Sequence, residues 1–109
     1  MYLVRILLLV GIVSFSSAEQ ISCTGRLTRV GFLPQYGGKV IAIDTEYRSG
    51  IWAKTVTEDK TEMVMSLLLA GLMADKTMLI QYNTQGATKC TEIEQWTGAI
   101  TVERVFVEK

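Results

Sequence analysis

Apolar and polar residues alternate along much of this chain, and a period of two is typical of strands with one solvated face. Pro34 and the pair Gly37-Gly38 separate the first two alternating stretches, which predicts a hairpin between them. In the last stretch the even-numbered residues, from Ile100 to Phe106, are expected to share one face of the strand. Five strands are predicted in all, at 21–33, 39–44, 51–56, 77–82 and 99–107.

The stretch 57–74 carries leucine and methionine at helical spacing, and these side chains cover more of the helix than one packed face needs. Asp59 followed by Glu62 resembles a capping box, with Thr57 as an alternative N-cap. A helix that is apolar on several sides is buried by more than one partner. We therefore expect it to lie between its own sheet and a neighbouring subunit, in a homo-oligomer. The alternative is a helix that is sunk deep in the core of a monomer.

The predicted order of elements is three strands, a helix and two strands, within a single domain at 19–109. This is the order of the OB-fold, a partly open Greek-key barrel of five strands. The expected fold is therefore mainly β (α+β), with the helix between the third and fourth strands closing one end of the barrel. Other small α+β folds share this order of elements.

Residues 1–18 have the three parts of a cleavable signal peptide, in the right order. Arg5 supplies the positive charge, 6–13 form an apolar run, and Ser16 and Ala18 are small residues at the positions that the peptidase reads. This pattern predicts cleavage after Ala18 and a secreted or periplasmic protein. The alternative is a membrane anchor, but the apolar run falls well short of the ~20 residues that span a bilayer. We expect no membrane span in the mature form.

Charge and composition exclude several classes of function. The full chain balances 11 basic against 11 acidic residues, so it lacks the basic surface that nucleic acid requires. It has no histidine, the most common general base and metal ligand. Cys23 and Cys90, the two cysteines of the chain, are expected to form a structural disulfide because the protein is exported. We predict a protein that is not an enzyme, with no catalytic residues, no metal site and no cofactor.

Aromatic residues flanked by amides lie in two of the predicted connections. OB-folds present ligands to the loops between strands one and two and between strands four and five. An aromatic ring can stack on a sugar ring while neighbouring amides bind its hydroxyl groups. The alternative for Trp96 is a structural role, in which it packs under its own loop in a small apolar cluster. Trp52 is expected in the core or in an interface. The candidate ligand-binding residues are Gln35, Tyr36, Asn83, Gln85, Gln95 and Trp96.

Several short segments of the mature chain carry a family resemblance. They are Ile21-Ser22-Cys23-Thr24-Gly25, the strand with Trp52, Ser66-Leu67-Leu68-Leu69, Lys76-Thr77-Met78-Leu79-Ile80-Gln81-Tyr82, Cys90-Thr91-Glu92-Ile93 and Trp96. With these segments the chain resembles short exported bacterial proteins, which are similar in turn to the B subunits of one-A-five-B toxins, especially that of subtilase cytotoxin. The resemblance implies an OB-fold module that forms a ring of five and binds glycans. The sugar-contacting residues of the toxins match no motif in this chain.

These observations together predict a non-enzymatic binding module that is exported and oligomeric, with a carbohydrate as its ligand. The alternative is an exported inhibitor or accessory protein that docks on another protein. Such a protein would use the exposed part of the apolar helix or an edge strand.

Overall fold

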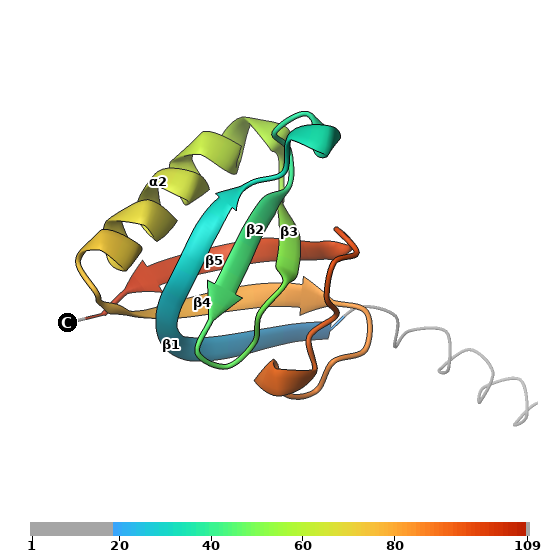
Figure 1. The fold of residues 1–109 in the computed structure, drawn as a ribbon. Helices are drawn as coiled ribbons and strands as arrows, with labels where there is room; N and C mark the ends of the chain where they lie inside the picture. Colours follow the sequence, from blue (N-terminus) through green and yellow to red (C-terminus); the bar gives the residue numbers. More distant parts are fainter. Residues whose placement is uncertain (1–18, 109) are drawn as a thin grey trace, which may run out of the picture.

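Five strands and one α-helix make up residues 19–108, the part of the chain that the computed structural model describes (Figure 1). The predicted signal peptide at 1–18 lies outside the described residues. Three short 3₁₀ turns lie in the connections: η1 (Pro34–Tyr36), η2 (Glu58–Lys60) and η3 (Cys90–Glu92). The mainly β class and the predicted order of elements are confirmed. The main elements are β1 (Glu19–Phe32), β2 (Ile41–Thr45), β3 (Ile51–Thr55), α2 (Thr61–Met73), β4 (Thr77–Thr84) and β5 (Ile100–Val107).

The five strands pair in the closed order β1-β2-β3-β5-β4. Strand β1 pairs with two neighbours in the barrel: residues 19–26 pair with β4, and residues 27–32 pair with β2. A bulge between Leu27 and Arg29 lies where β1 changes partner, and bulges increase the local bend of a strand. Figure 1 shows β1 curving strongly at this place. The predicted hairpin between the first two strands is confirmed, and a parallel pairing of β3 with β5 closes the barrel.

The core lies inside the barrel and under α2. Leu68 of α2 is fully buried, and Gly71 leaves room for the side chain of Met78 of β4, which a Cβ at position 71 would overlap. The helix packs mainly against β1 and β5. The largest buried strand side chains are Ile41, Ile43, Ile51, Met78, Ile80, Tyr82 and Ile100.

Of the two predicted N-caps, the alternative, Thr57, is the extended residue before the helical segment, and α2 itself begins at Thr61. The chain first forms η2, in which the backbone N–H of Lys60 donates to the carbonyl oxygen of Thr57 over 3.1 Å. Lys60 is then the N-cap of α2, and no side chain caps that helix. The capping box of Asp59 and Glu62 is also wrong, because a 3₁₀ turn leads straight into the helix and leaves no extended N-cap residue at position 59.

The predicted facing of β5 is correct up to Val102 and wrong beyond it. Tyr82 stands opposite Val102, whereas Gln81 stands opposite Arg104, so Glu103 is the extra residue of a bulge. Because a bulge of one residue exchanges the two faces of a strand, Val105 packs against the core. Arg104 and Phe106 point outward, and Phe106 is 55% exposed.

The predicted disulfide is confirmed: Cys23 of β1 is bonded to Cys90 of η3, with their Cα atoms 5.8 Å apart. The bond joins residues that are 67 positions apart, and it fastens the connection between β4 and β5 to the barrel wall. A loop of this length corresponds to about 4 kcal/mol in the loop-entropy model of disulfide stabilisation. Within residues 19–108, no helix combines the length and the apolar character needed to cross a bilayer.

Candidate binding groove

An open groove of about 420 Å³ lies on the outward face of β1, β2 and β3. Its floor is made of the residues that alternate with the buried ones on these strands, which is why Ala42, Asp44 and Trp52 face it. Trp96, from the connection between β4 and β5, stands beside them. Both tryptophans of the chain therefore line the same groove. The other lining residues are 29–33, Ser49 and Gly50.

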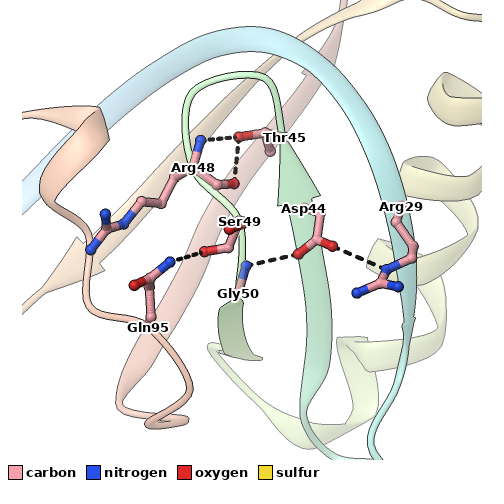
Figure 2. Close-up of polar contacts among 7 residues, drawn as sticks. All are labelled: Arg29, Asp44, Thr45, Arg48, Ser49, Gly50 and Gln95. Atoms are coloured by element: carbon pink, nitrogen blue, oxygen red, sulfur yellow. Dashed lines mark hydrogen bonds and ion pairs between the residues drawn. The ribbon is translucent and has the colours of Figure 1, made fainter.

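The hairpin between β2 and β3 is held by hydrogen bonds inside its own turn (Figure 2). The hydroxyl group of Thr45 donates to the carbonyl oxygen of Arg48, and the backbone N–H of Arg48 donates back to that hydroxyl, both over 2.9 Å. The backbone N–H of Gly50 donates to the carboxylate of Asp44 over 2.7 Å. Gly50 has a φ of +71°, a conformation that favours glycine. These contacts give the wall of the groove a defined shape.

Asp44 also forms an ion pair with Arg29 at the edge of the groove. Its second carboxylate oxygen accepts a hydrogen bond from Nε of Arg29 over 3.0 Å. The Asp44 side chain is 18% exposed, whereas the Arg29 side chain is 82% exposed. Within the described part of the chain, the two terminal nitrogens of the guanidinium group make no hydrogen bond, so they are available as donors to a ligand.

Three hydrogen bonds join the segment that carries Trp96 to the β2–β3 hairpin. Nε of Arg48 donates to the carbonyl oxygen of Ile93 over 2.8 Å. Nε2 of Gln95 donates to the carbonyl oxygen of Ser49, also over 2.8 Å (Figure 2). The backbone N–H of Trp96 donates to the carbonyl oxygen of Gly50 over 2.9 Å. The segment thus holds its tryptophan in a fixed place.

The indole ring of Trp96 rests on the backbone of Gly50. A Cβ atom at Gly50 would come within 2.5 Å of the indole nitrogen, so only glycine allows this approach. Trp96 itself is 59% exposed and has a φ of +56°, which is unusual for a residue other than glycine. Its ring therefore lies on the hairpin, open to solvent, and not under its own loop.

Trp52 packs against Tyr36 of η1. The two rings meet edge to face, with their centroids 6.1 Å apart and their planes at 66°. This geometry is favourable for aromatic pairs. Trp52 points outward from β3 and lines the groove, so its predicted place in the core is wrong, whereas its place in an interface stays a prediction. Its position between the buried residues Ile51 and Ala53 is the sequence signal for this outward direction.

The predicted candidates divide into two groups. Trp96 lines the groove, Tyr36 supports Trp52, and Gln95 holds the loop. Gln35 is an exposed neighbour of Tyr36 in η1. Trp96 is thus the one candidate that lines the groove. The last two candidates belong to β4 and the turn after it: Nδ2 of Asn83 lies 3.5 Å from the carboxylate of Glu103, and Gln85 is exposed. Sequence reasoning missed Arg29 and Asp44, which lie on separate strands and meet only in the barrel.

No known protein family, curated protein or solved structure matches this chain. The resemblance to toxin B subunits therefore rests on the sequence segments alone. Within residues 19–108 there is no group of three or more cysteine, aspartate and glutamate side chains placed to hold a metal ion.

Proposed function

We propose that this chain is an exported, non-enzymatic binding module with an OB-fold, and that its groove binds a carbohydrate. The closed strand order β1-β2-β3-β5-β4, with a helix between β3 and β4, supports the OB-fold. Export is supported by the signal-like pattern at 1–18 and by the disulfide between Cys23 and Cys90, since such bonds persist in oxidising compartments.

The observation that carries the proposal is that Trp52 and Trp96 line one groove with polar groups at its edge. Sugars have apolar C–H faces and a rim of hydroxyl groups, so they need aromatic surface next to a few well-placed donors and acceptors. The exposed guanidinium group of Arg29 supplies donors, and the exposed Ser49 supplies a hydroxyl group. Binding sites for small molecules commonly combine apolar walls with a few polar groups in this way.

The position of the groove fits the same interpretation. OB-folds bind ligands on the face of strands two and three, between the loop joining strands one and two and the loop joining strands four and five. In this chain the groove covers β2 and β3, and it is bounded by Leu33, after β1, and by Trp96, after β4. The two tryptophans and the polar groups beside them belong to one copy of the chain, so a single copy carries this groove.

Tryptophan fluorescence tests the proposal directly, because both tryptophans of the chain lie in the groove. Oligosaccharides chosen from a glycan array should shift and saturate the emission of the mature protein. Trp52→Ala and Trp96→Ala should each weaken binding about tenfold, as expected for one lost aromatic contact of ~1.4 kcal/mol. Met73→Ala, at an exposed position outside the groove, is the matched control and should leave the Kd unchanged.

A glycan array without any hit, together with unchanged emission at high sugar concentration, would contradict carbohydrate binding. The alternative, an accessory protein that docks on another protein, is favoured by the exposed apolar residues of α2, among them Met63 and Leu67. In that case a partner protein would bind Trp52→Ala as well as the unmodified chain, and Leu67→Lys would abolish the complex.

A further inference from the structure

Strand β5 has an edge that no other strand in the described part of the chain covers. One side of β5 pairs with β4 from Thr101 to Val107. On the other side, the parallel pairing with β3 ends where Val102 stands opposite Thr55. An uncovered edge presents backbone donors and acceptors that pair readily with a strand of another chain. The second half of β5 is therefore a place where one more strand fits.

The backbone groups at this edge belong to Val105 and Val107. The N–H of Glu108 donates to the carbonyl oxygen of Thr77 over 2.8 Å, so the strand geometry continues to Glu108. Because the direction of bonding alternates along an antiparallel pair, this bond turns the N–H and C=O groups of Val107 away from β4. The same alternation turns those of Val105 away from β4.

A groove of about 440 Å³ runs beside this edge, between β5 and α2. Met63, Leu67 and Val105 line it with apolar surface. Lys60 and Arg104 also line it, and both are exposed and without an ion pair among residues 19–108. An apolar side chain next to an acidic one would complement both parts of this surface.

The end of β5 has this complementary chemistry. Phe106 and Val107 are exposed large apolar residues, and the exposed Glu108 follows them. We propose that two copies of this chain pair through β5, antiparallel, about a two-fold axis at Phe106. The strand of the second copy then occupies the groove between β5 and α2. This contact gives a closed dimer, because the same surface is used by both copies.

The register follows from the side chains that stand opposite each other. With the axis at Phe106, the two Phe106 rings meet, Arg104 stands opposite Glu108 of the second copy, and Val105 stands opposite Val107. Cross-strand aromatic pairs and opposite charges stabilise a sheet. An axis at Arg104 would bring two guanidinium groups together, and an axis at Val105 would put Glu103 opposite Val107. Only the axis at Phe106 pairs opposite charges with each other and apolar residues with each other.

This register also pairs the backbone groups at the free edge of β5 and places an apolar side chain in the groove. Val105 and Val107 both direct their backbone groups to the free edge, so each exchanges two hydrogen bonds with the other residue on the second copy. Val105 packs toward the core, and the opposite Val107 shares its face of the sheet. Val107 of the second copy therefore lies over Met63 and Leu67, which are otherwise exposed.

Disulfide crosslinking of variants with one added cysteine tests the register. In the exported protein with its native disulfide, Phe106→Cys should form a covalent dimer under mild oxidation, because opposite Cα atoms of a non-hydrogen-bonded pair lie about 4.5 Å apart. Arg104→Cys is the matched control, since its two copies would lie about 14 Å apart along the strands and stay unlinked. Non-reducing mass spectrometry distinguishes the two. Faster linking at position 104 or 105 than at position 106 would overturn this register.

Charge exchange tests the contact without cysteine. In sedimentation velocity the unmodified protein should have twice the mass of one chain. Arg104→Glu and Glu108→Arg should each shift it to a monomer, because like charges then stand opposite each other, and the double variant should restore the dimer. Val107→Lys should also give a monomer, whereas Met73→Lys, at a position 85% exposed and outside the groove, should stay dimeric. A monomeric or five-chain unmodified protein overturns the proposal.

Discussion

The half-buried phenol group of Tyr47, in the β2–β3 turn, meets the buried phenol group of Tyr82. The hydroxyl groups of Tyr47 and Tyr82 lie 2.7 Å apart, and Tyr82 is fully buried. Burial raises the pKa of Tyr82 well above 10.0, and burial also raises the pKa of Tyr47. Both groups therefore stay neutral in the folded protein at a pH where they ionise in the unfolded chain.

This pair makes stability depend on alkaline pH. Since the folded pKa values exceed the unfolded value, the stabilising contribution is complete below about pH 10 and is lost as the pH rises above it. We expect the free energy of unfolding, measured by urea titration, to fall steadily above that pH. The double variant Tyr47→Phe with Tyr82→Phe should show a shallower fall, whereas Tyr36→Phe, an exposed phenol, should keep the original slope. Equal slopes for all three proteins would contradict this account.

At the scale of elements, the β2–β3 hairpin positions the groove, and Asp44 holds that hairpin. Replacing Asp44 with alanine removes the acceptor of the Gly50 N–H, and Gly50 is buried. A buried donor without a partner costs about 1–3 kcal/mol. We expect Asp44→Ala to lower the free energy of unfolding by this amount, measured by urea denaturation.

Arg29→Ala is the matched control for Asp44→Ala. It removes the same ion pair from its exposed side, and surface ion pairs contribute about 1 kcal/mol or less. A loss for Arg29→Ala as large as that for Asp44→Ala would show that the ion pair, and not the bond to Gly50, holds the hairpin.

The elements themselves were predictable because each has a clear period, but two local features were not. The bulge at Glu103 depends on how β5 pairs with β4 around the barrel, so alternation along β5 alone predicted the wrong face for Phe106. The 3₁₀ turn before α2 forms where the chain leaves β3, and the acidic residues there only resembled a cap. Both errors arise where tertiary packing overrides a local pattern.

For the groove, sequence reasoning found the two supporting loops and missed the floor. Tyr36 and Trp96 could be predicted because OB-folds place ligands at those loops. Arg29 and Asp44 are separated in sequence and adjacent only through the pairing of β1 with β2. The alternation of Trp52 with Ile51 and Ala53 could have predicted that Trp52 points outward. A tryptophan on a central strand is, however, also compatible with a place in the core.

At the scale of the molecule, the connection between β4 and β5 is fastened at two places. Cys90 bonds to Cys23 of β1, and residues further along bond to the β2–β3 hairpin through Gln95 and Trp96. The disulfide constrains the unfolded chain, whereas the hydrogen bonds position the tryptophan in the folded one. Stability and binding should therefore respond differently to loss of the disulfide.

The double variant Cys23→Ala with Cys90→Ala separates these two effects. Its free energy of unfolding should fall by about 4 kcal/mol, measured by urea denaturation, because the long loop is no longer closed. Its tryptophan emission in the folded state should match that of the unmodified protein, because Trp96 keeps its contacts with Gly50. Its Kd for a bound oligosaccharide should be unchanged for the same reason. A red-shifted emission in the folded double variant, with weaker binding, would show instead that the disulfide itself holds Trp96 against the hairpin.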